Sequence, residues 1–336
     1  MKAEASPAGY KAVARLYNAL MTGVVLTLVT QKDTEAARSF VFAHFRRQHL
    51  EKFLPGLKKL GLDTLPHAVA CAQYHYFSNA LGGVKTEYMP ESDRKAWVRY
   101  PPPRWIWQGA AICGVPREVN EAMLHGWHGH NGVSLGNPRL GFVCTGQTVN
   151  GDPGLEGYYY EYDHDLAPEE RVRFASGEHA PRFDPARAPK LDSASWPAER
   201  LLKVERSYAM EYVRSALPSL HELFGADEAC ALAGRTARLI GLQYYDEIAA
   251  LLGIRGDNAE DFAALLGALA ATQGEEVAVD GTAVTQRGWR LMYNVSDADA
   301  MFGAWNALWE GALAVHNRDL KLVTERQRDA IVWRIG

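Results

Sequence analysis

The chain of 336 residues has few cysteines and no basic block. Its four cysteines, Cys71, Cys113, Cys144 and Cys230, are far apart and form no CxxC pair, so neither a zinc knuckle nor a thioredoxin motif is expected. This pattern is typical of a reduced, cytoplasmic setting. The net charge is −4, and no cationic run could follow a phosphate backbone, so we expect no nucleic acid partner.

A secretion signal and a long apolar run are lacking as well. The N-terminus has neither the charged region nor the apolar core of a signal peptide. The most apolar stretch, 20–29, is interrupted by Thr22, Gly23 and Thr27 and is shorter than the roughly 20 residues that span a bilayer. We therefore expect no membrane partner, and we interpret this stretch as a buried part of an N-terminal helix over 1–35.

Two nucleotide-binding signatures are also missing. The sequence contains no P-loop and no GxGxxG followed by an acidic ribose-binding residue. These absences argue against an ATPase and a dinucleotide-dependent dehydrogenase. What is present is an ordinary globular composition, 47% apolar and 23% charged, in a chain long enough for two domains.

The second half of the chain has clear helix and strand signals. Asn258 is a typical N-cap residue with Asp261 three positions later, a variant of the capping box. Asp280-Gly281 separates two short apolar runs and predicts a hairpin. The expected helices cover 200–222, 226–252, 258–274 and 298–316, and the expected strands cover 275–280, 283–293, 319–325 and 330–335.

The first half repeats this order of elements. It predicts a helix before 60–62, a helix from about 66, strands around Trp97, a helix over 116–130, and strands near 139–146 and 156–163. Three anchors recur in one order: Leu-Gly-Leu at 60–62 with Leu-Gly-Ile at 252–254, Trp97 with Trp289, and Trp127 with Trp309. Matches of tryptophan and glycine also arise by coincidence, which is the alternative explanation.

The repeat predicts an α+β fold made of two tandem copies of one module. Each copy would contain a helix, a hairpin, a second helix and a strand pair, with antiparallel sheets and a pseudo-two-fold relation. The expected boundaries are an N-terminal helix over 1–35, a first copy over 36–165, a linker or wrapping loop over 166–198, and a second copy over 199–336. The first copy has ten more residues between its tryptophans, at a proline-rich loop over 101–107.

The unit over about 205–335 resembles the L-2-amino-thiazoline-4-carboxylic acid hydrolase family and the related 4-vinyl reductase domains. The resemblance rests on Leu-Phe-Gly-Ala-Asp-Glu-Ala at 223–229, on the helix over 258–274 with its hairpin, and on Trp309-x-Gly311. It implies a fold of this kind and favours a hydrolase acting on a C–N or C–S bond of a small molecule. The final strand, 331–335, has no cysteine, unlike many members, and no catalytic residue is transferred.

One segment of the first copy is dense in histidine. On a continuous helix, His125 and His128 would share a face, with Glu121 one turn earlier and His130 at the helix end. Two or three imidazoles and a carboxylate suit a divalent metal such as zinc or iron, and they equally suit general base catalysis near neutral pH.

The second copy has Ala307, Glu310 and Ala312 at the positions that match these histidines. A shared backbone would therefore not demand histidine there, which favours a catalytic role. The alternative is that the histidines cap the helix by bonding to loop carbonyls and bind no metal, so the metal question stays open.

Two other segments could contact a substrate. Strand alternation places Tyr158 and Tyr160 on one face of the strand near 156–163 and Tyr159 on the other. The former pair could line a pocket, or could simply form cross-strand aromatic pairs. In the proline-rich loop, Arg104 and Trp105 could close over a flat, anionic ligand.

These features favour a soluble enzyme acting on a small cyclic or aromatic polar substrate, possibly by hydrolytic ring opening. His128 or His130 would activate water, Glu121 would orient an imidazole, and Asn131 or Arg104 would stabilise negative charge. The alternatives are a small-ligand sensor or accessory subunit without catalysis, and a metal-dependent oxygenase or lyase. Substrate identity, any cofactor and self-association into a homo-oligomer are left open.

Overall fold

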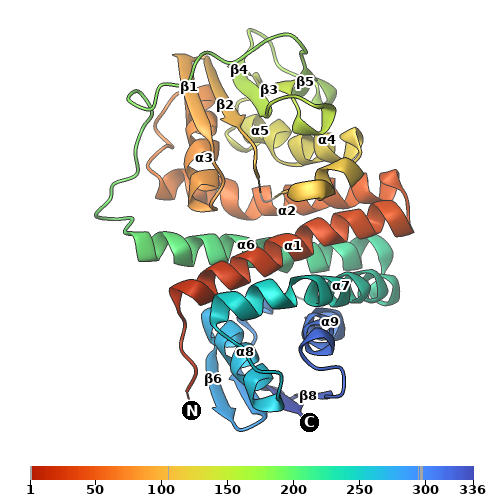
Figure 1. Ribbon diagram of the computed structural model, residues 1–336. Coiled ribbons are helices and arrows are strands. Elements are labelled where there is room, and N and C mark those ends of the chain that lie inside the picture. Colours follow the sequence, from red (N-terminus) through yellow and green to blue (C-terminus); the bar gives the residue numbers. More distant parts are fainter. Residues whose placement is uncertain (1, 105, 294, 296–297) are drawn as a thin grey trace. The chain divides into compact units, whose positions relative to one another are not determined.

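The computed structural model describes residues 2–104, 106–293, 295 and 298–336 (Figure 1). It divides into two compact units, one formed by Leu28–Trp196 and the other by Met1–Thr27 with Pro197–Gly336. Among the described residues, each unit combines helices with one sheet, and all but one of the strand pairs are antiparallel. The predicted α+β class is therefore confirmed. Trp105, one of the predicted substrate contacts, lies outside the described residues.

The unit Leu28–Trp196 has a five-stranded sheet in the order β1-β2-β4-β3-β5, with β5 parallel to β3. Asp33 starts its longest helix by accepting a hydrogen bond from the Ala36 amide at 2.7 Å. The elements are α2 (Thr34–Lys59), α3 (His67–Leu81), β1 (Glu87–Ser92), β2 (Lys95–Tyr100), α4 (Arg117–Gly126), α5 (Asn131–Ser134), β3 (Leu140–Gly146), β4 (Leu155–Glu161) and β5 (Val172–Phe174), with 3-10 turns at Gly109–Gly114, His128–His130, Thr148–Asn150 and Pro168–Glu170.

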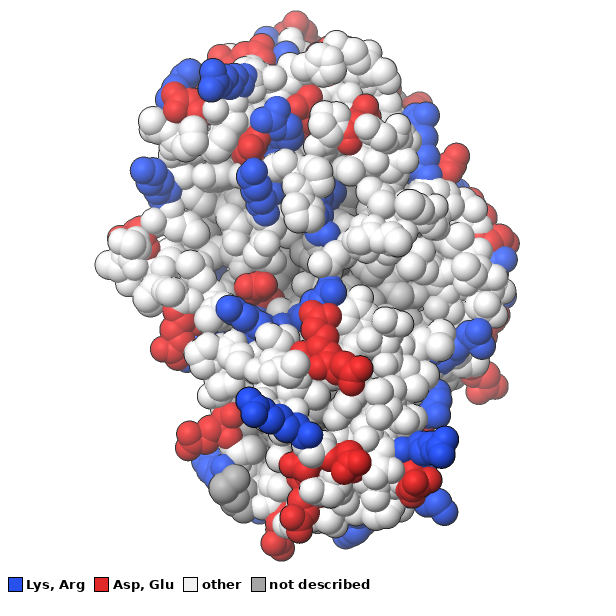
Figure 2. All heavy atoms as spheres, in the orientation of Figure 1, with Lys and Arg blue, Asp and Glu red and all other residues white. Residues whose placement is uncertain are grey.

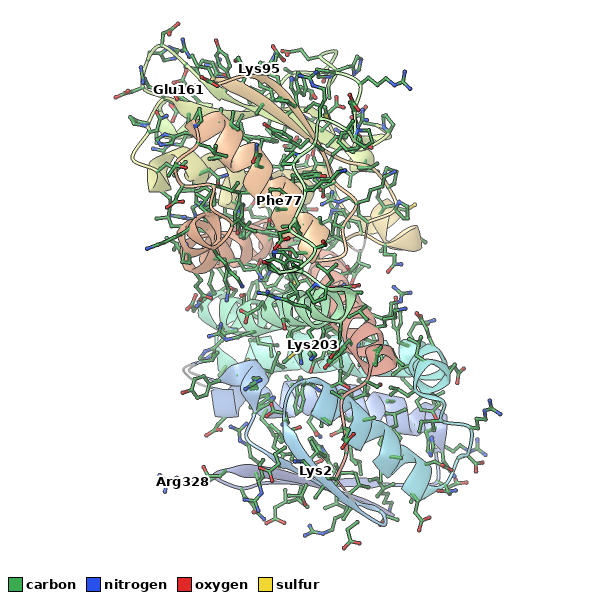
Figure 3. All side chains as sticks on the ribbon, turned by 90° about the vertical axis from the view of Figure 1, so that its left-hand side faces the viewer. Lys2, Phe77, Lys95, Glu161, Lys203 and Arg328 are labelled. Carbon is green, nitrogen blue, oxygen red and sulfur yellow. The ribbon has the colours of Figure 1, made fainter. Side chains whose placement is uncertain are left out.

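The two faces of this sheet are covered differently. Helix α3 lies against one face, and Figure 3 shows its Phe77 beneath the sheet that carries Lys95 and Glu161. On the opposite face, a cluster of Met89, Trp97, Val143 and Tyr158 is covered by Ala175, Ala180 and Phe183 from the segment that follows β5. Tyr158 and Tyr159 therefore point to opposite faces, as the strand alternation predicted.

The other unit has a four-stranded antiparallel sheet in the order β6-β7-β9-β8, with α8 packed against it. Gly241 and Gly311 let α7 and α9 approach closely, since an added Cβ would lie 2.1 Å from a carbonyl oxygen of the facing helix in each case. The elements are α1 (Pro7–Gln31, which continues past this unit), α6 (Ala198–Phe224), α7 (Ala226–Leu252), α8 (Ala259–Thr272), β6 (Glu276–Asp280), β7 (Ala283–Arg287), α9 (Ala298–His316), β8 (Leu322–Arg326) and β9 (Ala330–Ile335), with a 3-10 turn at Arg290–Met292.

The helix start and the hairpin turn predicted for the second half of the chain are confirmed. The Asn258 side chain accepts a hydrogen bond from the Asp261 amide at 3.0 Å and so begins α8. The turn at Asp280-Gly281 joins β6 to β7, with Gly281 at a φ of 54°. One strand is shorter than expected, because Gly288 takes a φ of 80° and ends the extended conformation after Arg287.

The predicted match between tryptophans is wrong at the level of secondary structure. Trp97 lies within β2, whereas Trp289 follows the end of β7 and precedes a 3-10 turn. Trp127 ends α4, whereas Trp309 lies inside α9. The physical reason is that β7 and α4 both stop earlier than a strict repeat would require.

Helix α1 is long and apolar enough, by length and composition, to cross a membrane, and 67% of its most apolar window is buried within the protein. Leu20, Val24 and Val25 are at most 4% exposed. The interpretation of this stretch as a buried part of an N-terminal helix is therefore confirmed. On the face shown in Figure 2, acidic and basic side chains alternate over the surface rather than gathering by sign.

Candidate functional site

The histidine-rich segment is not one continuous helix, which corrects the prediction for 116–130. Helix α4 ends at Gly126, and His128–His130 forms a 3-10 turn. Gly126 packs against α2 so closely that a Cβ would lie 2.7 Å from the Phe42 carbonyl oxygen. The change of helix type sends His125 and His128 to different surroundings: His125 is half-buried near Phe174, whereas His128 is buried under the sheet.

A buried hydrogen-bond chain runs from α5 through β4 to the 3-10 turn. Asn131 Nδ2 donates to Tyr159 Oη at 2.8 Å, and Tyr159 Oη lies 2.7 Å from His128 Nδ1. Asn131 and Tyr159 are fully buried, and His128 is 6% exposed. Tyr159 points toward these helices because side chains alternate along β4. His128 and Asn131 reach it because α4 ends at Gly126 and a 3-10 turn follows.

These hydrogen bonds determine which atoms of Tyr159 and His128 carry the protons. An amide nitrogen can only donate, so Tyr159 Oη accepts from Asn131 and its own proton is directed to His128 Nδ1. The neutral His128 ring then carries its proton on Nε2, which makes this nitrogen a hydrogen-bond donor. Burial, with smaller contributions from Arg104 and His49, lowers the pKa of His128 to about 3. Burial also holds the pKa of Tyr159 well above its usual value, so both groups are neutral at physiological pH.

His75 on α3 extends this network. Its ring stacks on His128 with centroids 4.1 Å apart and planes 12° apart, and its Nε2 lies 3.4 Å from Asn131 Nδ2. Burial, followed by the nearby His128 and His49, lowers the pKa of His75 well below its usual value. One turn earlier, Cys71 is fully buried, and burial raises the pKa of its thiol. The Cys71 thiol therefore stays protonated and unreactive, and the residue contributes packing to this site.

Arg104 contributes positive charge to the same place. It lies over the Tyr100 ring, with the guanidinium carbon 5.1 Å from the centroid. After burial, its charge is the largest cause of the lowered pKa of His128. Of the predicted site residues, the structure thus brings together His128, Asn131 and Arg104.

Glu121 belongs to a different network. Its Oε1 accepts hydrogen bonds from Arg117 Nε at 2.5 Å and Gln147 Nε2 at 3.0 Å. Gln147 in turn accepts from Asn120, whose oxygen accepts from the Trp107 indole at 3.0 Å. The hydrogen bonds of Glu121 thus go to Arg117 and Gln147, its charge raises the pKa of His125, and the hydrogen-bond partner of His128 is Tyr159.

His130 and His125 lie nearer the surface. His130 Nδ1 donates to the His125 carbonyl at 2.9 Å, the capping contact that was the alternative reading of this segment. This bond leaves His130 Nε2 with a lone pair. Burial, then the Arg46 charge, lowers the pKa of His130. For His125 burial again lowers the pKa, and the Glu121 charge opposes it.

Tyr158 and Tyr160 do not reach the buried network. Tyr158 belongs to the cluster on the opposite face of the sheet, where the Lys95 ammonium lies 4.3 Å from its ring centroid. Tyr160 packs against that cluster. Tyr158 and Tyr160 therefore lie on the opposite face of the sheet from the buried network, and Tyr159 is the residue of this strand that joins it.

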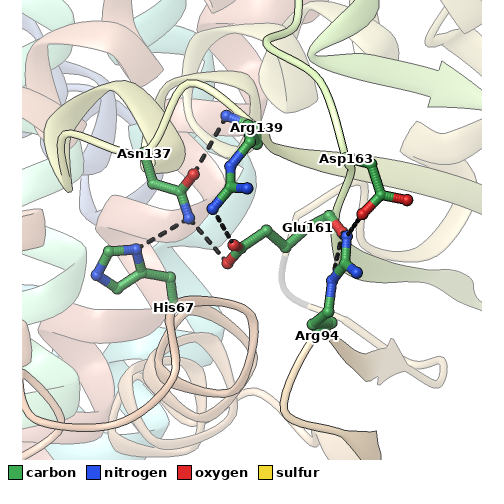
Figure 4. Close-up of polar contacts among 6 residues, drawn as sticks. All are labelled: His67, Arg94, Asn137, Arg139, Glu161 and Asp163. Carbon is green, nitrogen blue, oxygen red and sulfur yellow. Dashed lines mark hydrogen bonds and ion pairs between the residues drawn. The ribbon is translucent and has the colours of Figure 1, made fainter.

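A second polar group joins the start of α3 to the ends of β3 and β4 (Figure 4). Asn137 Nδ2 lies 3.0 Å from His67 Nδ1 and donates to Glu161 Oε2 at 2.9 Å. Arg139 Nη2 donates to Glu161 Oε1 at 2.9 Å, and Arg94 pairs with Asp163 at 2.7 Å. Each of the six residues has a partner within the group, so the group holds these elements together.

Sequence reasoning missed His49, Cys71, His75 and Tyr159. Three of them come from helices α2 and α3, far along the chain from the histidine-rich segment, and only Tyr159 had a signal, as the inward residue of the alternating strand. Within the described ranges, no three His, Cys, Asp or Glu side chains are grouped to hold a metal ion. Comparisons with protein-family models, curated proteins and solved structures found no match.

Proposed function

We propose that this protein is an enzyme acting on a small cyclic or aromatic polar molecule that binds beside His128. The observation that carries the proposal is the buried chain from Asn131 through Tyr159 to His128. It presents one N–H donor, at Nε2, within a wall of aromatic rings. Few, well-placed polar groups in an aromatic wall are typical of sites that bind small molecules.

In this proposal His128 donates a hydrogen bond rather than activating water. A histidine whose pKa is about 3 is a weak base at neutral pH, but its neutral N–H is a good donor to an atom that becomes negative. Arg104 adds positive charge close by. Together they would stabilise the charge that develops when water adds to a ring carbon.

His130 is the better candidate for the base. Its Nδ1 is occupied by the His125 carbonyl, so its Nε2 is free to accept a proton from water. The concrete reaction we propose is hydrolytic ring opening: water adds to the ring carbon, the C–N or C–S bond breaks, and the proton taken up by His130 passes to the released nitrogen or sulfur. The resemblance of 205–335 to the L-2-amino-thiazoline-4-carboxylic acid hydrolase family suggested this class of reaction, and it transfers no residue to this site.

The second candidate is a small-ligand sensor or accessory subunit that does not catalyse a reaction. Three buried neutral imidazoles, His49, His75 and His128, favour recognition of a ligand as much as chemistry on it. A metal-dependent oxygenase or lyase would require ligands beyond those grouped within the described ranges. Elemental analysis of purified protein separates this third candidate from the others.

The test is His128→Phe, which keeps a ring against His75 and removes the Nε2 donor. We expect turnover of a panel of nitrogen- and sulfur-containing heterocycles to fall by about 10²-fold or more, as for loss of one donor to a developing charge. His179→Phe, an exposed change in the same unit, is the matched control and retains activity. Full activity of a folded His128→Phe would contradict the proposal.

We also propose that the modules over 36–165 and 199–336 arose by duplication. Hairpin and strand pair occur in the same spatial order in both sheets, β1-β2-β4-β3 and β6-β7-β9-β8, and this supports the idea. A cytoplasmic location, argued from the widely spaced cysteines, is part of the same proposal.

A further inference from the structure

Two arginines and a histidine from three segments of the chain gather beside the 3-10 turn that ends at His130. Arg46 lies on α2, and Arg171 directly precedes β5. Arg46 Nη1 lies 2.7 Å from His49 Nδ1, and the His49 ring centroid lies 6.1 Å from that of His130. Arg171 begins at the same turn, since a Cβ added to Gly129 would lie 3.8 Å from Arg171 Cβ. Folding therefore brings both arginines to His130.

The positive charges of this group act on one another without a counter-charge. Burial lowers the pKa of Arg46, and the charge of Arg171 lowers it further. Burial, then the charge of Arg46 and to a smaller extent that of Arg171, lowers the pKa of His130. Within the described ranges no carboxylate pairs with either guanidinium, because Glu170 is bonded to Arg173 at 3.1 Å. A bound anion would relieve this repulsion.

The group can be reached from solvent, in contrast to the buried network around His128. Arg46, His130 and Arg171 are each half-buried, so part of every side chain is exposed. The Arg46 guanidinium is held in place at His49 by one of its N–H groups, and its remaining N–H groups are available to a ligand. Phe42, which is 40% exposed, lies with its ring centroid 6.1 Å from that of His130.

We propose that Arg46 and Arg171 bind a phosphate group beside His130. A phosphate group carries up to two negative charges and at least three acceptor oxygens, so it can pair with both guanidiniums at once. A carboxylate typically pairs with one guanidinium through its two oxygens and would leave the other charge without a partner. The inference goes beyond the proposed function and does not rest on it, because neither arginine belongs to the chain from Asn131 to His128.

The first measurement is the affinity of the full-length protein for inorganic phosphate, by isothermal titration calorimetry at constant ionic strength. Arg171→Gln should weaken binding by at least about tenfold, through loss of charge-assisted hydrogen bonds. Arg173→Gln is the matched control: it removes the same charge two residues away, from a side chain that pairs with Glu170, and should weaken binding by about twofold or less. Arg46→Gln should act like Arg171→Gln. If it fails to fold, by circular dichroism, Arg171→Gln decides.

Phenyl phosphate, titrated in the same way, distinguishes two sources of the phosphate group. Tighter binding than that of inorganic phosphate, lost in Phe42→Ala, indicates the phosphate ester of a small molecule whose ring packs on Phe42. Equal affinities indicate the free anion. Either result supports the site, provided that Arg171→Gln weakens the binding of both ligands.

The second measurement is the pKa of His130, followed by NMR of its ring resonances, which are assigned by their loss in His130→Gln. The pKa should be higher in sulfate, a dianion of the same shape as phosphate, than in chloride at equal ionic strength, because the bound anion offsets the two guanidinium charges. In Arg171→Gln the pKa in chloride should already be higher than in the wild type, and sulfate should raise it less. His49 remains neutral near pH 7, because its pKa is about 3.

Three results would overturn the phosphate site: no saturable binding of phosphate, equal affinity in the wild type and Arg171→Gln, or equal weakening by Arg171→Gln and Arg173→Gln. The last result would show that net charge alone attracts the anion. None of them bears on the proposed reaction, which is tested separately by His128→Phe.

Discussion

His128 and His130 are two residues apart, yet their ring nitrogens are held in opposite states. His128 Nδ1 accepts from Tyr159, whereas His130 Nδ1 donates to the His125 carbonyl. One ring therefore offers an N–H and the other a lone pair at Nε2. The short 3-10 turn between α4 and α5 makes this division of roles available within one segment.

Tyr159→Phe should destabilise the protein by about 1–3 kcal/mol. The change keeps the ring but leaves the buried Asn131 amide and His128 Nδ1 without their shared partner. Urea denaturation measures the difference. Tyr160→Phe, on the opposite face of the same strand, is the matched control and should stay within about 0.5 kcal/mol of the wild type. Equal effects of the two changes would contradict the buried chain.

Acid should destabilise the unit Leu28–Trp196 well above the range in which carboxylates titrate. The pKa values of His49 and His128 are about 3 in the folded protein, against an ordinary value of 6.5. Between these values the unfolded chain binds more protons than the folded one, so stability is present above 6.5 and is lost as pH falls.

Each of the two histidines should contribute a slope of up to about 1.4 kcal/mol per pH unit below 6.5. The measurement is the free energy of unfolding between pH 8 and pH 4.5. His49→Phe should reduce the slope by the contribution of one histidine, and the exposed His179→Phe is the matched control for the substitution itself. A flat profile down to pH 4.5 would show that the imidazoles are not buried as neutral groups.

Arg104→Ala should raise the pKa of His128, because the guanidinium disfavours protonation of that ring. The pKa is measured by NMR titration of the histidine ring resonances. Arg94→Ala is a suitable control, since Arg94 is exposed and pairs with Asp163 instead. An unchanged His128 titration in Arg104→Ala would mean that the loop does not approach the site in solution.

Gly126→Ala should destabilise the protein by about 1–3 kcal/mol, since the new Cβ meets the backbone of α2 at Phe42. Gly303→Ala is the contrasting change: it lies in α9 with nothing within 4 Å, and alanine there should stabilise the helix by about 0.5–1 kcal/mol. Thermal or urea unfolding of the two variants gives the comparison. A tolerated Gly126→Ala would place the end of α4 away from α2.

The elements that sequence predicted well depend on local signals. The Asn258 cap and the turn at Asp280-Gly281 act within a few residues, and the structure keeps both. The end of α4 depends on how Gly126 meets α2, a contact between segments far apart in sequence, so periodicity alone extended that helix too far.

Contacts between distant segments also explain why the candidate site was predicted only in part. Histidine density identified His128, and Asn131 lay in the same segment. The partners that set its chemistry, His75 and Tyr159, come from another helix and from a strand face. Only the packing of α3 against the sheet brings them together, and one sequence does not reveal which helix covers which face.

The two sheets differ in the strand that forms one of their edges, β5 in the first and β8 in the second. In one, the edge strand beside β3 is β5, which is only three residues long and offers few backbone groups to a further strand. In the other, β8 is an edge strand that carries Glu325 and Arg326, exposed charges that disfavour pairing with a further strand. A short edge strand thus limits further pairing in the first sheet and exposed charge limits it in the second, so high salt should weaken the protection of the β8 edge first.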